Sequence, residues 1–168
     1  MPVRFMHGNR DFLVANAFAS ATGIELIADP TMVDLYGTRT ALLHGDTLCT
    51  DDAEYQRLRV QMRDPRWQQM VLARPIAERV AMAQGMRAQS ESYKAGKENE
   101  IMDVAPAAVE EAFRACGCDR MIHGHTHRPG RHEYRVDGRT CVRWVLPDWY
   151  VKGGYLEVSP EGVRALAA

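Results

Sequence analysis

Hydrophobic and polar residues follow a pattern whose period changes several times along the chain. The first half carries short apolar runs typical of strands, with a helical spacing over residues 12–23. We expect Asp11 to cap that helix and Gly23 to end it. The predicted strands cover residues 2–6, 24–28, 31–36 and 39–46. The last of these runs is apolar almost throughout, which is typical of a strand covered on both faces.

From residue 51 to residue 98 the spacing of apolar residues becomes helical. Asp51 and Glu54 are spaced like a capping box, while Pro65 and Pro75 divide the segment into separate helices. The pattern therefore predicts an all-helical insertion, a lid, within the domain.

Strands and one helix return after this insertion. Pro106 and Gly117 bound a helix over residues 107–116. The predicted strands cover 119–123, 131–136, 140–146, 153–159 and 162–166, and the "VDGR" turn joins two of them in a hairpin. The order of elements predicts an α/β fold with mixed sheets, in a single domain over residues 1–168.

Composition excludes some classes of protein. The 168 residues are 46% hydrophobic, which is enough for one hydrophobic core. The net charge of −1 lacks the excess of positive charge that nucleic-acid-binding proteins usually carry. The four cysteines have no CxxC spacing, and no apolar N-terminal segment is present, so we expect reduced thiols in the cytoplasm. The sequence contains no run of about 18 apolar residues, the length needed to span a bilayer. Contact with a membrane surface is a separate question that this absence does not decide.

The helical insertion is unusually basic and rich in methionine. Residues 57–97 carry nine lysines and arginines against three acidic residues. Their apolar side chains exceed what a thin helical layer needs for its own packing. Two interpretations fit this composition: a core stripe with a solvated basic face, or a cap that receives an anionic head and an apolar tail.

Three polar clusters follow predicted strands: "HGNRD" at 7–11, "HGDTLCTDD" at 44–52 and "HGHTHRP" at 123–129. Strand ends of an α/β sheet are where such folds place ligands. A tight loop lets the rings of His125 and His127 turn to one point. With Asn9 and His44 they form a set of neutral ligands suited to Mn²⁺, Fe²⁺ or Zn²⁺ rather than Ca²⁺.

The motifs "HGNRD", "LHGDTLCTDD", "IMDV" and "IHGHTHRP", in this order and spacing, resemble the UDP-2,3-diacylglucosamine hydrolases, a branch of the calcineurin-like metallophosphoesterases. The resemblance covers essentially the whole chain. It implies a sandwich of mixed β-sheets flanked by helices. It also implies hydrolysis of the pyrophosphate of UDP-2,3-diacylglucosamine to UMP and 2,3-diacylglucosamine 1-phosphate in lipid A biosynthesis. Mn²⁺ would be the cofactor, and the protein would work as a peripheral protein on the cytoplasmic face of the inner membrane, with no protein partner.

The same resemblance implies roles for individual residues. Asn9, His44 and His125 match ligands of one metal ion, and His127 matches a ligand of a second. Lys94 departs from an asparagine-like contact in the family and is predicted as a phosphate or sugar neighbour. The other implied substrate contacts are Asn9, Arg10, Asp52, Ser90, Lys97 and His125.

Asn9 and Arg10 carry the implied catalytic roles. Many metallophosphoesterases have a histidine at the position of Arg10, where it protonates an alkoxide leaving group. Arginine does not donate its proton, so we expect Arg10 to clamp phosphate oxygens while a sugar phosphate leaves. Of the remaining histidines, His7 and His123 are expected to support ligands or pack, and His132 to lie on an exposed strand.

The chain departs from the family pattern at its start. Family members begin with an Asp-x-His loop and a Gly-Asp loop, and this sequence has neither. We expect about two strands to be missing from the front, because of a misplaced start codon. The chain as given would then lack the carboxylate that bridges the two metal ions in the family. Two alternatives stay open: another metallophosphoesterase, or a noncatalytic remnant that binds a metal or a nucleotide-sugar.

Overall fold

The computed structural model describes residues 2–95, 103–150 and 153–168, apart from the side chains of residues 91 and 93–95. Its main element is a five-stranded sheet with the order β3-β4-β5-β7-β6. Strands β4 (Thr38–Leu43), β5 (Arg120–His123) and β7 (Arg139–Val145) run parallel. The edge strands β3 (Thr31–Leu35) and β6 (Gly130–Val136) run antiparallel to their neighbours. The mixed α/β fold predicted from the sequence is confirmed.

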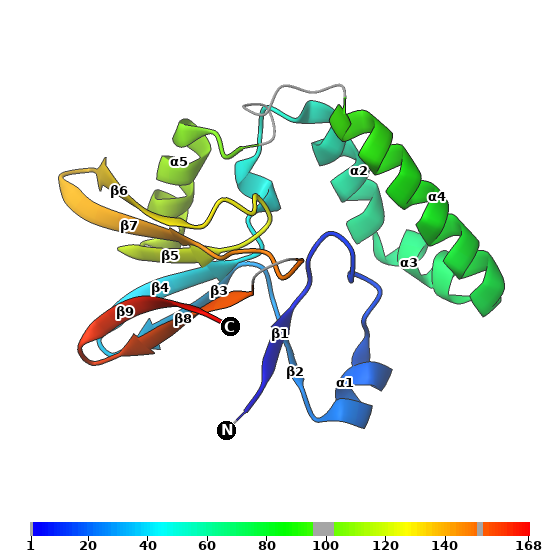
Figure 1. Cartoon of the computed structure of the whole chain (residues 1–168), viewed down its shortest axis with the longest axis horizontal. Coiled ribbons are helices and arrows are strands. Elements are labelled where there is room, and N and C mark those ends of the chain that lie inside the picture. The colour runs from blue at the N-terminus through cyan, green and yellow to red at the C-terminus, as the bar shows by residue number, and fades with distance from the viewer. Residues whose placement is uncertain (1, 96–102, 151–152) are drawn as a thin grey trace.

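Helix α5 (Pro106–Cys116) covers one face of this sheet (Figure 1). It places Val109 and Phe113, both fully buried, against the strands. The strand side of this core consists of Ala41, Leu43, Met121, Val136 and Cys141. As expected, the helix begins at Pro106 and ends at Gly117, whose φ of 55° is left-handed.

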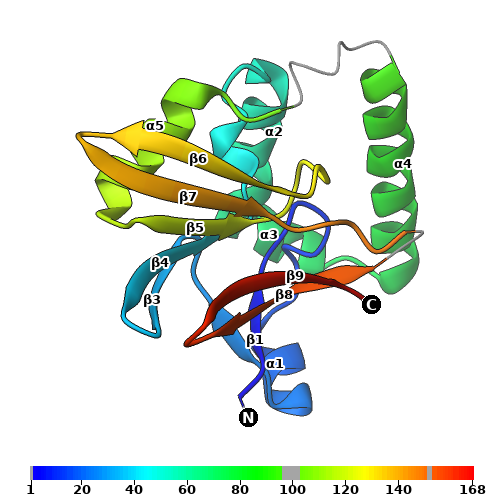
Figure 2. The same ribbon diagram turned by 60° about the vertical axis from the view of Figure 1, so that its left-hand side comes forward.

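Two smaller sheets flank the main one. Strand β1 (Arg4–Met6) pairs in parallel with β2 (Glu25–Ile27), and α1 (Asn16–Thr22) connects them. Strands β8 (Gly154–Ser159) and β9 (Gly162–Ala167) form a hairpin on the side of the main sheet away from α5 (Figures 1 and 2).

The insertion forms three helices that lie together beyond the strand ends of the main sheet (Figure 1). They are α2 (Ala53–Arg63), α3 (Pro65–Leu72) and α4 (Ile76–Ala95). Pro65 opens α3 and Pro75 precedes α4, so the predicted division is confirmed. A short 3-10 helix, η1 (Asp46–Leu48), links the sheet to α2.

Two predicted helix caps are wrong. Helix α1 begins four residues later than the pattern suggested, with Ala15 at its N-cap, and the Asp11 carboxylate instead accepts a hydrogen bond from the Gly8 amide. At the start of α2 the capping carboxylate is that of Asp52, which accepts from the Tyr55 amide across 3.0 Å, rather than that of Asp51. Adjacent acidic residues compete for one cap, and the path of the chain decides between them.

Candidate active site

The carboxyl ends of the three parallel strands lie at one edge of the main sheet, and each leads into a polar loop. Strand β4 ends before His44, β5 before Gly124, and β7 before residues 146–150. The loop after β1 supplies residues 7–11. Parallel pairing therefore brings segments about 80 residues apart in the sequence to one place.

His44 and His125 meet in this region. Nδ1 of His125 lies 3.1 Å from Nε2 of His44, and the ring centroids are 4.9 Å apart. Two nitrogens that each bind one ion at about 2.1 Å are separated by about 3.0 Å when they are 90° apart at the metal, and by about 3.4 Å in a tetrahedral site. The two imidazoles are within hydrogen-bond distance of each other, and their spacing also suits two ligands of one metal ion, which stays a prediction. Burial lowers the pKa of His44, which favours the neutral ring that a metal ion requires.

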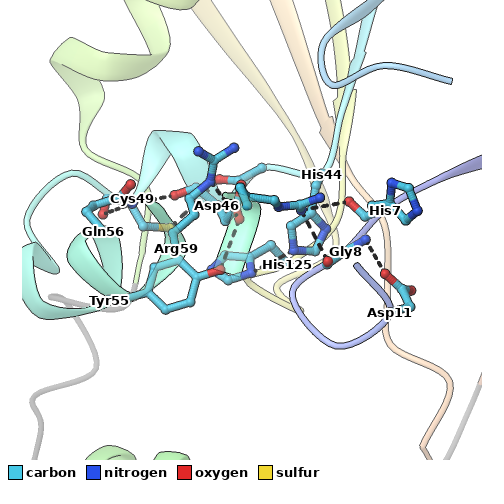
Figure 3. Close-up of polar contacts among 12 residues, drawn as sticks. His7, Gly8, Asp11, His44, Asp46, Cys49, Tyr55, Gln56, Arg59 and His125 are labelled. Atoms are coloured by element: carbon cyan, nitrogen blue, oxygen red, sulfur yellow. Dashed lines mark hydrogen bonds and ion pairs between the residues drawn. The ribbon is translucent and has the colours of Figure 1, made fainter. Parts of the chain in front are cut away.

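Asp46 lies beside this pair (Figure 3) and is fully buried. Its carboxylate lies 3.0 Å from Nε of Arg59 and accepts a hydrogen bond of 3.0 Å from the Tyr55 hydroxyl. Burial alone would raise the pKa of Asp46, but the charges of His44 and Arg59 and the Tyr55 hydrogen bond lower it. Asp46 is therefore a fixed negative charge beside the histidines, and the sequence reasoning gave it no role.

A polar cavity of about 860 Å³ opens on the His44 and His125 rings. The predicted site residues that line it are Asn9, Arg10, His44, Asp52, Ser90, His125 and His127. The structure thus brings together residues from three loops and from α4. The side chain of Lys94 and the whole of Lys97 lie outside the described residues, so those two predictions are untested.

His127 contacts the loop after β7. Its Nδ1 lies 3.6 Å from the Asp148 carboxylate, and its ring centroid is 5.9 Å from that of Tyr150. A carboxylate behind a histidine is a common support for a metal ligand. Asp148 and Tyr150 were missed from the sequence, where only "DWY" directly after an apolar strand could have indicated them.

Within the part of the chain that the structure describes, no three histidine, cysteine, aspartate or glutamate side chains lie close enough together to hold a metal ion. His44 and His125 are thus the ligands that the geometry supports, and Asn9 and His127 share their cavity. The described residues thus supply part of the ligand set that a metal ion needs.

The other histidines behave as expected. His123 is buried, with Nδ1 2.9 Å from the Gly124 carbonyl oxygen and Nε2 3.0 Å from Nη1 of Arg143. His7 contacts the Val14 carbonyl oxygen through Nε2 at 2.6 Å. His132 is exposed on β6.

An apolar groove continues from the cavity between the insertion helices. It shares Asn9, Arg10, Tyr55, Arg87 and Ser90 with the cavity. Its apolar lining consists of Phe12, Leu13, Leu58, Met62, Trp67, Val71, Met82, Ala83 and Met86. The methionine-rich composition of the insertion thus corresponds to a lined groove, and the interpretation as a core stripe alone does not account for it.

The chain is similar to curated UDP-2,3-diacylglucosamine hydrolases. It is 50% identical to that of Xanthomonas campestris pv. campestris over an alignment of 170 positions that covers 97% of this chain and 69% of the relative. It is 49% identical to that of Xanthomonas oryzae pv. oryzae over the same shares, and 49% identical to that of Cellvibrio japonicus over 94% of this chain and 66% of the relative. No family model matches the chain.

The chain belongs to the UDP-2,3-diacylglucosamine hydrolase family. Identity of one half over nearly the whole chain is far above what a shared fold alone produces. The resemblance found on four motifs is therefore confirmed, and with it the class of hydrolase acting on a pyrophosphate bond. A metal cofactor is implied by the family. The described structure has no disulfide among the four cysteines, and none of its described helices has the length and apolar character needed to cross a bilayer.

Proposed function

We propose that this chain hydrolyses the pyrophosphate of UDP-2,3-diacylglucosamine, giving UMP and 2,3-diacylglucosamine 1-phosphate for lipid A biosynthesis. The observation that carries the proposal is the direct continuity between the polar cavity holding His44 and His125 and the apolar groove of the insertion. A substrate with a charged diphosphate and two acyl chains requires both environments side by side.

Mn²⁺ is the proposed metal ion, with Asn9, His44 and His125 as ligands of one ion and His127 as a ligand of a second. The amide oxygen of Asn9 is a ligand type that suits Mn²⁺, whereas imidazole ligands are shared with Fe²⁺ and Zn²⁺ sites. When bound, such ions polarise the phosphoryl group and lower the pKa of bound water. Burial lowers the pKa of His44 and so favours the uncharged imidazole, which is the form that binds a metal ion.

Arg10 and Asn9 are proposed to hold the phosphates. Both residues line the cavity and the groove, so they stand where the charged and the apolar parts of a substrate meet. The guanidinium of Arg10 matches two phosphate oxygens with parallel N–H groups and needs to donate no proton to a leaving sugar phosphate.

The two openings orient the substrate. The groove takes the acyl chains past Met62, Met82 and Met86, while His127 and Tyr150 line the cavity and not the groove. The nucleoside therefore lies toward Tyr150. An exposed aromatic ring at that end suits a nucleobase, since stacking contributes about 1–3 kcal/mol per base.

Attachment to the cytoplasmic face of the inner membrane is proposed on the exposed apolar residues of the insertion. Ile76 and Val80 on α4 and Met70 and Leu72 on α3 are all exposed. Apolar side chains beside basic ones suit the surface of a membrane with anionic lipids.

Release of UMP from UDP-2,3-diacylglucosamine, with and without added Mn²⁺, tests this function. Turnover with Mn²⁺ that is abolished by EDTA supports it, and turnover of unacylated UDP-glucosamine at an equal rate contradicts the role of the groove. A noncatalytic binder is the second candidate, favoured by the absence of a three-residue metal cluster among the described residues. Binding of substrate without UMP release would establish it.

A further inference from the structure

One face of helix α2 carries polar side chains that turn inward instead of toward solvent (Figure 3). Tyr55, Gln56, Arg59 and Arg63 are spaced so that they follow one stripe of a helix. All four are half-buried, whereas Arg57 on the same helix is exposed. An inward polar stripe requires partners, because unpaired polar groups are costly away from water.

The first half of the stripe binds the loop that begins with His44. The Tyr55 hydroxyl and the Arg59 guanidinium both hold the buried Asp46 carboxylate, each at 3.0 Å. Nε2 of Gln56 donates to the backbone carbonyls of Asp46 at 2.7 Å and Cys49 at 3.0 Å. Two side chains thus fix the carboxylate and a third fixes the backbone around it.

The last residue of α2 binds a different loop. Nη2 of Arg63 donates to the carbonyl oxygens of His7 at 3.2 Å and Gly8 at 3.1 Å. These carbonyls directly precede Asn9 in the chain. One guanidinium therefore holds the backbone that presents Asn9 and Arg10 to the cavity.

The two loops come from different sheets, since residues 7–11 follow β1 and residues 44–52 follow β4. Helix α2 contacts both of them through side chains two turns apart. A rigid helix with fixed contacts at both ends sets the distance between the objects it joins.

We infer that α2 is a brace, in which Tyr55, Arg59 and Arg63 act as positioning residues that fix the Asn9 loop relative to the His44 loop. This inference rests on the proposed function for its consequence, because the two loops carry the proposed metal and phosphate contacts. Because Arg59 and Arg63 bind the two loops, they are not among the basic residues of the insertion that are available to an anionic substrate.

Hydrogen exchange of the loop over residues 7–11 tests the brace without metal or substrate. In the Arg63→Met variant, the amides of this loop exchange about tenfold faster than in the unaltered protein, because the loop loses two hydrogen bonds to α2. Arg57→Met, which removes an exposed arginine from the same helix, leaves exchange unchanged. Equal protection in Arg63→Met and the unaltered protein overturns the inference. Should Arg63→Met fail to fold, Arg63→Lys, with its single ammonium group, gives a smaller rise.

Mn²⁺ affinity measured by calorimetry tests the consequence. Tyr55→Phe and Arg63→Met raise the Kd for Mn²⁺ about tenfold, as expected when the support of a metal ligand is lost, and Arg57→Met does not. Destabilised variants with unaltered Kd values overturn the positioning role and leave only a structural one. If the unaltered protein binds no Mn²⁺, the proposed metal site fails, and the exchange comparison alone decides the brace.

Discussion

Nη1 of Arg143 lies 3.0 Å from Nε2 of His123 in the interior of the main sheet, where both side chains are almost fully buried. The contact assigns Nε2 as an acceptor and Nδ1 as the donor to the Gly124 carbonyl oxygen. His123 is therefore neutral in the folded protein, and its burial next to a guanidinium lowers its pKa to about 4.

This lowered pKa predicts a pH-dependent stability. The unfolded chain takes up a proton near the usual histidine pKa of about 6.5, while the folded protein resists protonation until about pH 4. The neutral His123 therefore contributes about 3 kcal/mol to the free energy of unfolding above pH 6.5, and this contribution is lost as the pH falls toward 4. Urea unfolding at pH 7 and pH 4.5 measures it. In His123→Gln the loss over this interval should be smaller, and an identical loss contradicts the assignment.

Gly45 makes a close approach that only glycine allows. Its φ is 109°, and an added Cβ would lie 2.5 Å from Nδ1 of His123 and 3.2 Å from the Gly124 carbonyl oxygen. We expect Gly45→Ala to lower the free energy of unfolding by at least about 3 kcal/mol, from strain and overpacking together. Gly138→Ala, also at positive φ but with open space around it, should cost only about 1 kcal/mol. Thermal or urea unfolding of both variants compares the two effects.

The spacing of His44 and His125 predicts the effect of removing either ring. His44→Ala and His125→Ala should each weaken Mn²⁺ binding by about 100-fold or more, because each loses one direct ligand. His132→Ala, on the exposed strand β6, is the matched control and should bind Mn²⁺ like the unaltered protein. Calorimetric titration separates these outcomes, and equal affinity in all three variants would contradict the proposed site.

The position of Arg10 predicts its effect on ligand binding. Arg10→Met should raise the Kd for 2,3-diacylglucosamine 1-phosphate at least tenfold, since charge-assisted hydrogen bonds contribute about 1.5–3 kcal/mol. Arg4→Met alters an exposed arginine on β1 that pairs with Glu25 and should change nothing. Fluorescence or calorimetric titration measures both. Arg10→His with unchanged activity would count against the phosphate clamp.

Some features of the fold depend on local chemistry and were predicted from it. Gly23 ends α1 with a left-handed φ of 73°, and the turn at residues 136–139 joins β6 to β7. Such signals act within a few residues, so they hold whatever surrounds them. Where two local signals compete, as at Asp51 and Asp52, sequence alone did not decide between them.

Within the candidate site, the sequence predicted which residues carry the chemistry, because histidine, asparagine and arginine loops at strand ends stand out in any arrangement. Their motifs also placed the chain in its family. Only the tertiary structure decided what supports these loops: Asp46 as a buried charge, Asp148 behind His127, and Arg63 on the carbonyls of His7 and Gly8. The physical reason is that these contacts join residues up to 56 positions apart. Their geometry exists only once parallel strands and the insertion have packed together.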